Sequence, residues 1–534
     1  MTRESAKNVE KGSCQVSDIL EVFGRYQIFQ YVLICLPSVF VTMIDINYVF
    51  VAGDLEYRCR VNECEDTNST SAFPTWWPNS TRDRCMRPVL KQGISSCTNE
   101  SFTPQLTECT EWIYESNNTI VAELNLACQP WKSNLIGTIH CIGMLVSMFV
   151  CGWLCDRYGR KPTLVVCVVG SCIGQLKKFA TTWDLYIVIE FLEACLSGGS
   201  YTPAMVLLLE ICGRKHRILS GVLFAYFIYL GESLFACIAM FAPYWKTIVT
   251  IIYSPLVLFV FYFFLVHESP RWLIVKGKTE QAKAALRRIA EANKLDLNHE
   301  EFDDLNEAQL KQKFNITDVE VKERLAAVFM SKEILKRLLV STVCRFTASF
   351  VYYGLMINSV LLPGDKYTNF LLATIMSFPG ELISLYLMNK IGRKLPLMVG
   401  YVMSGVLCIG SGYVPDSMTW AKISLFLFGK MVIAACYTGA ITYTMELFPT
   451  SARGSLLGLG SFASRVGGML APLTPILSTV SPTLPSICFG CSAVLSGVLL
   501  TLTPETKELP LMDTVQQVED SIRKAKEIER SQRT

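Results

Sequence analysis

Asp156-Arg157-Tyr158-Gly159-Arg160-Lys161 is a charged stretch that closes a long apolar segment, and Asn389-Lys390-Ile391-Gly392-Arg393-Lys394 closes another in the second half of the chain. Two further elements recur in the same order. Glu210 precedes Arg217 as Glu446 precedes Arg453, and His267-Glu268-Ser269 is matched by Pro504-Glu505-Thr506. Charged elements that recur in the same order at nearly the same offset indicate a duplicated unit.

The apolar residues between these elements occur in blocks. Of 534 residues, 51% are hydrophobic and 18% are charged, whereas soluble proteins carry about 25% charged residues. A helix needs roughly 20 mostly apolar residues to cross the hydrocarbon core, and in lipid the backbone must satisfy its own hydrogen bonds. We therefore predict an all-α membrane protein with two six-helix lobes, at 27–266 and 338–503. Its twelve helices are expected to begin near residues 27, 134, 163, 185, 218, 246, 338, 368, 395, 419, 455 and 483.

The basic residues predict the orientation, because short loops rich in lysine and arginine stay in the cytosol. Such loops follow the second, fourth, eighth and tenth predicted helices. They share one side if the N-terminal segment, 1–26, is cytosolic, and an even number of helices returns the tail, 504–534, to that side. No cleavable signal peptide is visible in the polar first 25 residues, so the first helix is expected to direct insertion.

A long polar loop, 52–132, marks the opposite side. Its six cysteines indicate an oxidising compartment and three disulfides, with fifteen possible pairings. These residues are Cys59, Cys64, Cys85, Cys97, Cys109 and Cys128. The loop also holds four sequons for N-glycosylation, at Asn68, Asn79, Asn99 and Asn117. Asn315 lies in a sequon too, but its loop should be cytosolic and therefore free of glycan.

A mixed-charge segment, 267–337, separates the two lobes. Within it, Thr279–Asn293 has helical spacing, with one face made by Ala282, Ala285, Leu286 and Ile289. We predict short amphipathic helices at the cytosolic membrane surface, which either hold the lobes together or form a solvated linker.

The repeated charges suit a gate, because ion pairs in tight turns can break and form again. The glycine permits the turn, and the carboxylates can pair with the cations around them. The expected gating residues are Asp156, Arg157, Arg160, Glu210, Arg217, Glu268 and Arg271 in the first half and Asn389, Arg393, Glu446, Arg453 and Glu505 in the second.

These motifs resemble the major facilitator superfamily, whose members have two six-helix lobes and a central site that opens to alternate sides. Within it the chain is similar to the organic ion transporters, which carry organic cations, organic anions or carnitine. The resemblance covers nearly the whole chain. It rests on the six-cysteine loop, Glu268-Ser269-Pro270-Arg271-Trp272-Leu273, Glu446-Leu447-Phe448-Pro449-Thr450 and Ser464-Arg465-Val466-Gly467. Sugar porters share similar cytosolic motifs, including one like Pro504-Glu505-Thr506-Lys507, but lack the cysteine-rich loop.

Charged residues inside the membrane are costly and usually functional, so they indicate the type of substrate. Arg465 stands where the resemblance gives aspartate in organic cation transporters and arginine in anion and carnitine transporters. Lys430 and Arg345 are further candidate cations in the second half, although the family usually has no arginine at the Arg345 position. The first half carries carboxylates instead: Asp45, Glu190, Glu193 and Glu232. Glu190 and Glu381 depart from the family pattern, which usually has arginine and, in anion transporters, lysine there.

An acidic first lobe that faces a basic second lobe suits a zwitterion, whose two ends are recognised separately. Tyrosine faces attract ammonium groups, and Tyr201, Tyr229, Tyr353 and Tyr437 are the candidates to line the site. The expected substrate is a small carnitine-like or betaine-like ion, carried across the plasma membrane. The alternatives are an organic cation facilitator, an organic anion exchanger, a sugar porter, or a membrane receptor or scaffold.

Enzymatic chemistry is not indicated. The four histidines lack metal-ligand spacing, and Gly277-Lys278-Thr279 lacks the upstream glycine of a phosphate loop. We therefore expect no cofactor, metal, nucleotide or nucleic-acid partner. The expected partners are the lipid bilayer and the substrate, and a coupling ion, Na⁺ or H⁺, is left open.

Overall fold

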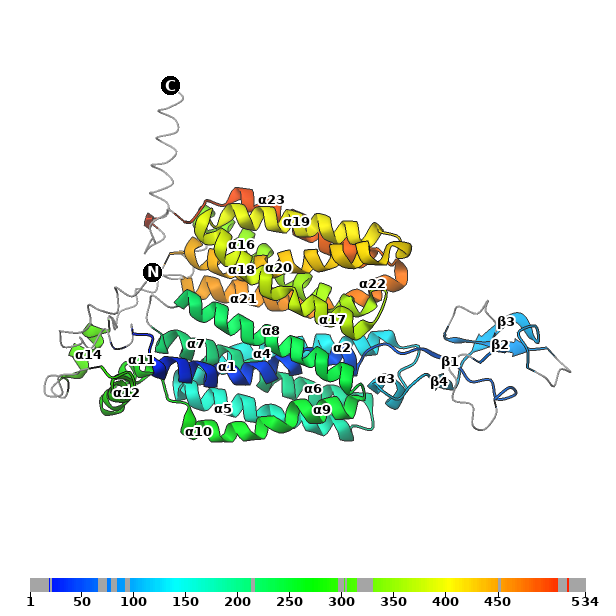
Figure 1. Cartoon of the computed structure of the whole chain (residues 1–534), viewed down its shortest axis with the longest axis horizontal. Coiled ribbons are helices and arrows are strands. Elements are labelled where there is room, and N and C mark those ends of the chain that lie inside the picture. The colour runs from blue at the N-terminus through cyan, green and yellow to red at the C-terminus, as the bar shows by residue number, and fades with distance from the viewer. Residues whose placement is uncertain are drawn as a thin grey trace, which may run out of the picture.

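The computed structural model describes residues 19, 22–65, 74–77, 84–91, 97–212, 217–295, 302, 305–314, 330–449, 453–507, 516 and 517; for 217–219, 416 and 453 it describes the backbone alone. Two bundles of long helices lie side by side, with a small strand domain at one end and short helices at the other (Figure 1). We call these two ends of the molecule the disulfide end and the motif end.

The first lobe is built from helices that run the length of the bundle. It comprises α1 (Arg25–Ile46), α2 (Tyr48–Val51), α4 (Pro130–Tyr158), α5 (Arg160–Gly170), η2 (Ser171–Phe179), α6 (Trp183–Ser197), η3 (Gly198–Ser200), α7 (Tyr201–Ile211), α8 (Arg217–Phe241), α9 (Trp245–Tyr253), η5 (Ser254–Phe261) and α10 (Tyr262–Leu265).

The second lobe repeats this plan. It comprises α16 (Lys332–Asn358), η6 (Ser359–Leu361), α17 (Lys366–Ile375), α18 (Ser377–Lys390), α19 (Lys394–Tyr413), η7 (Asp416–Met418), α20 (Thr419–Leu447), α21 (Arg453–Leu470), η8 (Ala471–Leu473), α22 (Thr474–Val480), α23 (Leu484–Leu499) and η9 (Leu500–Leu502). The helix α16 begins ahead of the apolar stretch at 338, because charged residues such as Lys332 and Arg337 continue it toward the motif end.

Eleven helices in the described part of the chain are long and apolar enough to cross a membrane. The twelfth predicted segment, near residue 163, is helical as α5 and η2, but it carries Lys177 and Lys178 and is not among the eleven. Large apolar side chains face outward around the bundle, among them Phe241, Phe264 and Trp420. The expected helical membrane fold is confirmed, and the chain is a multi-pass membrane protein; the strands of the polar loop depart from the all-α prediction.

The linker begins with α11 (Pro270–Val275), α12 (Thr279–Ala292) and α14 (Glu307–Lys313). As predicted, α12 buries Ala282, Leu286 and Ile289 on one face. Asn293 at its end accepts a hydrogen bond from the Tyr26 backbone N–H at 3.1 Å and donates one to Gln27 at 2.8 Å. The linker therefore packs against the start of α1, at the motif end.

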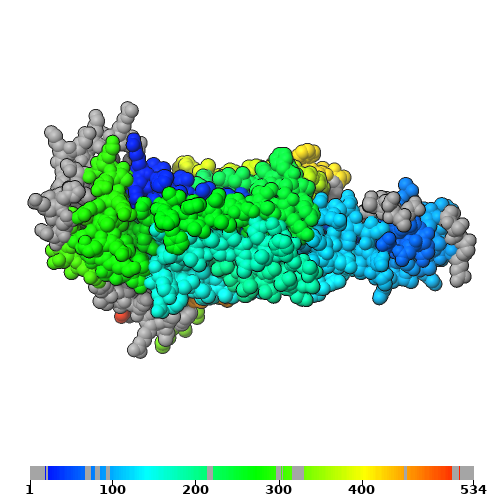
Figure 2. Space-filling view, turned by 90° about the horizontal axis from the view of Figure 1, so that it is seen from below, coloured from blue at the N-terminus to red at the C-terminus, as the bar shows by residue number. Residues whose placement is uncertain are grey.

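The polar loop forms a small domain that projects from the bundle (Figure 2). Antiparallel pairs join β1 (Tyr57–Cys59) to β4 (Trp112–Tyr114) and β2 (Met86–Leu90) to β3 (Phe102–Glu108), and α3 (Ile120–Glu123) leads back to the bundle. The three disulfides are Cys59–Cys109, Cys64–Cys97 and Cys85–Cys128. Closing loops of this size is worth about 4 kcal/mol each in the chain-entropy model, which compensates for a small core.

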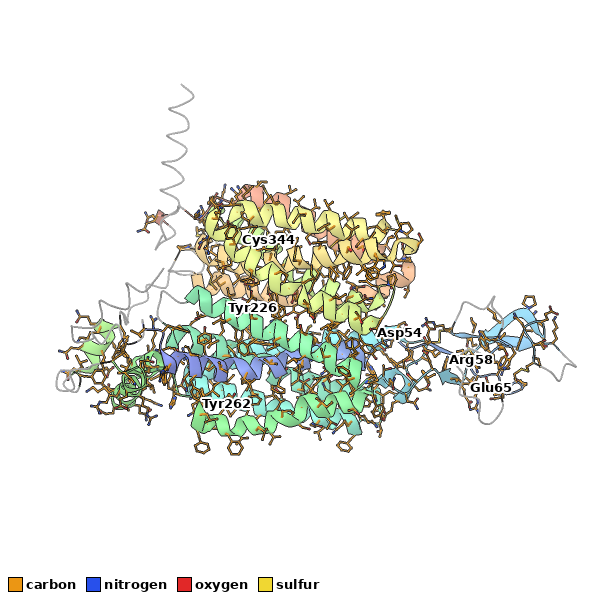
Figure 3. The ribbon with its side chains drawn as sticks, viewed as in Figure 1. Asp54, Arg58, Glu65, Tyr226, Tyr262 and Cys344 are labelled. Atoms are coloured by element: carbon orange, nitrogen blue, oxygen red, sulfur yellow. A yellow bond between two sulfur atoms is a disulfide. The ribbon has the colours of Figure 1, made fainter. Side chains whose placement is uncertain are left out.

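That core is organised around a buried arginine. Arg58 is 1% exposed and lies 5.2 Å from the ring centres of both Trp76 and Trp77. It pairs with Glu65, as their neighbouring positions in Figure 3 show. Of the four sequon asparagines, Asn99 and Asn117 lie exposed in this domain, whereas Asn68 and Asn79 fall outside the described residues, as does Asn315.

Glycosidase treatment of the protein from animal cells tests the side on which this domain lies. We expect the apparent mass to fall, because Asn99 and Asn117 are exposed beside disulfides, and Asn99→Gln and Asn117→Gln should each remove one step of the shift on a denaturing gel. Asn315→Gln is the matched control and should leave the shift unchanged. A shift that disappears with Asn315→Gln would place the linker outside the cell instead.

Candidate functional site

The candidate site lies where the two lobes meet. Tyr352 on α16 donates to Glu232 on α8 at 3.1 Å, and Tyr229 on α8 donates to Glu381 on α18 at 3.3 Å. Tyr226 points from α8 toward the second lobe in Figure 3, and its ring centre lies 5.5 Å from that of Phe378. These contacts connect the lobes in the middle of the bundle.

Further contacts between the lobes lie toward the disulfide end. Phe50 stacks on Tyr367 at 5.1 Å between ring centres, and Thr138 on α4 donates to the Met469 carbonyl on α21 at 3.3 Å. The lobes are thus joined at the centre and near the disulfide domain.

Arg465 extends from α21 into this region without a carboxylate partner. Its Nη1 lies 3.8 Å from the Met144 sulfur on α4, and Tyr353, Tyr437, Asp45 and Tyr201 lie close enough to influence its charge. None of the described carboxylates forms an ion pair with it. The guanidinium is therefore a half-buried cation whose bidentate donors are not used by any acid in the described part of the chain.

The other two candidate cations are also in the second lobe. Arg345 on α16 is buried and donates to the Ser461 hydroxyl at 3.2 Å, while its Nε has no hydrogen-bond partner. Lys430 on α20 is fully buried, donates to the Tyr352 carbonyl at 3.0 Å and lies over the ring of the same tyrosine. All three candidate cations of the predicted site thus lie in this lobe.

Two carboxylates of the region accept hydrogen bonds from hydroxyl groups. Glu381 is 1% exposed and accepts from Thr438 at 2.7 Å and from Tyr229. Glu232 accepts from Tyr352 and interacts electrostatically with Lys430. Glu381, like Arg465, has no partner of opposite charge among the described residues.

The tyrosines lie between these charges. The ring of Tyr352 lies 5.5 Å from that of Tyr437 and 5.3 Å from that of Tyr353. Tyr353 and Tyr437 are half-buried beside Arg465, and Tyr229 belongs to the side with Glu381. The structure therefore brings most of the sequence-predicted residues together in one region between the lobes.

The remaining first-lobe carboxylates belong to a different group. Tyr201 donates to Asp45 at 2.8 Å, and Asp45 lies 3.2 Å from His140 Nε2. Glu190 and Glu193 lie within the lobe, where Lys177 pairs with them at 2.7 and 3.0 Å. Neither glutamate contributes to an acidic face toward the second lobe, because both are neutralised inside the first.

Sequence reasoning missed two members of this group, His140 and Lys177. The signal was present, because a lysine inside an otherwise apolar segment needs a partner. His140, Glu190 and Glu193 offer ligand atoms within 4.8 Å of one another, the arrangement of a metal site. The Lys177 ammonium supplies the cation there instead.

The repeated motifs form two clusters at the motif end. In the first motif cluster, Arg160 donates to Glu210 at 3.1 and 3.2 Å, and its backbone N–H donates to Glu268 at 3.1 Å. In the second, Arg393 donates to Glu446 at 3.2 Å and its N–H donates to Glu505 at 2.8 Å. The duplication seen in the sequence is therefore also a duplication of contacts.

The turn glycines fit this arrangement. Gly159 and Gly392 have φ values of 118° and 141°, and a Cβ at these positions would approach a Glu268 oxygen to 2.3 Å and a Glu505 oxygen to 2.8 Å. Each carboxylate accepts backbone N–H groups at the start of a helix, α5 or α19, where a negative charge is favourable.

Some expected gating residues contribute less. Asp156 lies 3.4 Å from Arg160, but its side chain is 80% exposed, so the pair contributes little. Arg157 is exposed and contacts Trp153 and Tyr158. Asn389 lies on a surface hollow of about 670 Å³ on one face of α18, away from the central charges. Arg271 is half-buried, and the side chains of Arg217 and Arg453 lie outside the described residues.

The fold and the interlobe charges define a membrane transporter with two similar lobes, and comparisons agree. The chain resembles a partially occluded inward open conformation of the xylose transporter XylE from E. coli, with a TM-score of 0.63, 14% identity and coverage of 91% of this chain and 100% of that one. A family model for "Sugar (and other) transporter" matches residues 93–517. The chain belongs to this family, within the major facilitator superfamily, and is a transporter rather than an enzyme.

Relatives along the full length agree with the resemblance to organic ion transporters. Solute carrier family 22 member 3 of Rattus norvegicus is 29% identical, over 93% of this chain and 94% of that protein. The organic cation transporter protein of Drosophila melanogaster is 28% identical, over 93% of each. Solute carrier family 22 member 6-A of Xenopus laevis is 29% identical, over 94% of this chain and 93% of that protein.

Glu268 and Glu505, the carboxylates of the two motif clusters, have pKa values shifted in opposite directions. Burial raises the pKa of Glu268 above its ordinary value, although backbone N–H groups oppose the shift. Burial also acts on Glu505, but the N–H groups of Arg393, Lys507 and Lys394 outweigh it and hold its pKa below the ordinary value. A carboxyl with a lowered pKa stabilises the fold at neutral pH, and this contribution is lost as pH falls through the folded pKa. A carboxyl with a raised pKa lowers the free energy of unfolding at neutral pH instead.

We therefore expect Glu505→Gln to lower the melting temperature of the detergent-purified protein at neutral pH, by a loss of about 1 kcal/mol that is typical of a helix cap. Glu268→Gln should preserve or raise it, because the charge that it removes is costly. Acidification below the ordinary range of glutamate should reduce the difference between the Glu505→Gln variant and the wild type. Equal losses in both variants at neutral pH would contradict the assignment of opposite signs.

Proposed function

We propose that this protein carries small organic ions across the plasma membrane by alternating access, and that its preferred substrates are zwitterions of the carnitine or betaine type. The observation that carries the proposal is Arg465 beside Tyr353 and Tyr437, in the same region as Glu381; neither charge has a partner of opposite sign among the described residues. A substrate carboxylate would accept bidentate hydrogen bonds from the guanidinium. An ammonium end would find tyrosine faces and a carboxylate.

The relatives support the choice of organic ions, since their names include an organic cation transporter. Asp45 is less suited to the positive end than Glu381, because Tyr201 and His140 already occupy its oxygens. Glu381 accepts only hydroxyl groups among the described residues and can still receive a cation.

The transport cycle follows from the contacts between the lobes. In this conformation the lobes meet at the centre and toward the disulfide end, while each motif cluster is satisfied within its own lobe. We place the disulfide domain outside the cell and the termini, motif clusters and linker in the cytosol. On that orientation the present conformation holds the outer side together.

An organic anion is the second candidate substrate. It is favoured by the excess of basic groups in the second lobe, where Arg345, Arg465 and Lys430 face few acids. A zwitterion fits better, because an anion alone would leave Glu381 without a partner.

Uptake by Arg465 variants tests the proposal. Arg465→Asp should reduce uptake of L-carnitine at least about 100-fold and spare that of tetraethylammonium, because losing one charged hydrogen-bonding partner of a buried group costs about 3 kcal/mol. Arg465→Lys should be impaired as well, since a point charge cannot bind a carboxylate in bidentate fashion. Surface biotinylation provides the measure of delivery.

The matched control is Arg157→Ala, which removes an exposed arginine of the same chain and should leave carnitine uptake near the wild-type level. If Arg465→Asp transports carnitine as the wild type does, Arg465 is structural and an organic cation facilitator becomes the better reading. If wild-type uptake is confined to dicarboxylates or other pure anions, the organic anion candidate replaces the zwitterion.

The motif clusters should set the rate of switching between conformations. We expect Arg160→Ala and Arg393→Ala to slow carnitine uptake several-fold at normal surface abundance, with little change in KM, since both residues lie far from the central charges. Asp156→Ala should have a smaller effect than Arg160→Ala, because the Asp156 side chain is exposed. A double Arg160→Ala, Arg393→Ala variant with wild-type uptake would refute the gating role.

A further inference from the structure

Five ionisable residues form a continuous buried chain inside the first lobe. The chain runs from Asp45 on α1 to His140 on α4, then to Glu190 and Glu193 on α6 and to Lys177 on η2. The side chains of His140, Glu190, Glu193 and Lys177 are 0% exposed, while that of Asp45 is 12% exposed. Asp45 is therefore the member through which the group contacts the space between the lobes.

Both ring nitrogens of His140 face carboxylate oxygens. Nδ1 lies 2.8 Å from Glu190 Oε1, and Nε2 lies 3.2 Å from Asp45 Oδ1. A carboxylate only accepts, so both contacts are hydrogen bonds when both nitrogens carry a proton. The geometry is that of an imidazolium held between two carboxylates, and removal of its proton leaves one nitrogen lone pair facing a carboxylate.

The position of His140 links it to Arg465. One helical turn along α4, Met144 contacts the Arg465 guanidinium at 3.8 Å, and Cys141 donates to the Gly468 carbonyl at 3.6 Å. Asp45 interacts electrostatically with Arg465 but forms no ion pair with it. Asp45 thus lies between the ring of His140 and the guanidinium of Arg465.

We propose that His140 is a proton-binding site that couples transport to the proton gradient, so that the protein moves one proton together with a carboxylate-bearing substrate. The proposal rests on the proposed function, because it needs Arg465 to bind the substrate carboxylate. A proton on His140 neutralises Asp45 and leaves Arg465 free for the substrate. Without that proton, Asp45 carries an uncompensated charge and competes with the substrate for Arg465.

The proton balance is simple. The proton enters from water at Asp45, the exposed member, and binds the free ring nitrogen of His140, so that one N–H bond forms. It leaves by the reverse route after the substrate is released. Because proton and substrate carboxylate each favour the binding of the other, they travel in the same direction.

Several titratable and charged groups surround His140. Lys177 is held by both glutamates and by the Tyr253 hydroxyl at 2.9 Å. The titratable and charged groups around His140 are Asp45 of α1, Tyr48 of α2, Lys177 of η2, Glu190 and Glu193 of α6, Tyr201 of α7, Cys141 of α4 itself and Arg465 of α21. Among the described residues, Asp45 joins His140 to the interlobe region, at 3.2 Å from its Nε2.

The experiment uses the full protein in liposomes with L-carnitine as the probe. Counterflow at equal pH on both sides measures carnitine transport itself and tests the proposed function. An acidic external buffer then tests the coupling. We expect this pH gradient to raise the accumulated carnitine several-fold above its level at equal pH. A dye trapped inside should report acidification when carnitine is added outside.

Two variants separate coupling from folding. Asp45→Asn removes the competitor for Arg465, so KM should stay at its acid value between about pH 6 and pH 9, where the wild-type KM should rise at least about 5-fold. His140→Gln keeps one hydrogen bond but cannot titrate, so KM should stay at the alkaline value. Neither variant should acidify the liposomes. His267→Gln, a matched control outside the network, should behave as the wild type.

Wild-type liposomes that show counterflow without acidification or gradient-driven accumulation would overturn proton coupling and leave the proposed function intact. Coupling that persists in both His140→Gln and Asp45→Asn would also overturn it. An absence of carnitine counterflow at every pH would overturn both proposals. If His140→Gln fails to fold, the wild-type and Asp45→Asn measurements decide.

Discussion

Charge neutralisation inside an apolar bundle is the constraint on which this structure depends. A charge buried without a partner is expensive, so each ionisable group in the helices is paired, hydrogen-bonded or placed where a ligand can complete it. In the first lobe Lys177 joins Glu190 and Glu193, and His140 joins them to Asp45. In the second lobe Arg465 and Glu381 lack such partners among the described residues, and this difference is the basis of the proposed site.

Charges are neutralised in the same way at the motif end, which is more exposed to solvent. Glu268 and Glu505 accept backbone N–H groups of α5 and α19, while Arg160 and Arg393 pair with Glu210 and Glu446. Both clusters tie three segments of one lobe together, so each lobe can move as a unit. The tyrosine and glutamate contacts between Tyr352, Glu232, Tyr229 and Glu381 are fewer and join different lobes, as expected of a surface that has to separate.

The sequence was sufficient for the fold, because hydrophobic length and repeated charges are local signals. It also pointed to Arg465, Glu381 and the nearby tyrosines as candidates, since residues of these types stand out in apolar segments. It could not show which charges meet. Glu190 and Glu193 looked like part of an acidic cleft, but their orientation depends on the packing of α6 against η2, which places them on Lys177. The disulfide pairing was equally inaccessible, because it depends on strands that bring distant cysteines together.

Lys177 has a consequence for how this lineage can change. Its ammonium holds two fully buried glutamates, and removing one partner of such a group costs about 3–5 kcal/mol, a large share of the stability of most proteins. Substitution of Lys177 alone should therefore be too destabilising to be tolerated. It should become tolerable once the Glu193 carboxylate has already been lost. The order of substitutions is therefore restricted. Related proteins should either keep Lys177 with both glutamates, or have lost a glutamate before they lost the lysine.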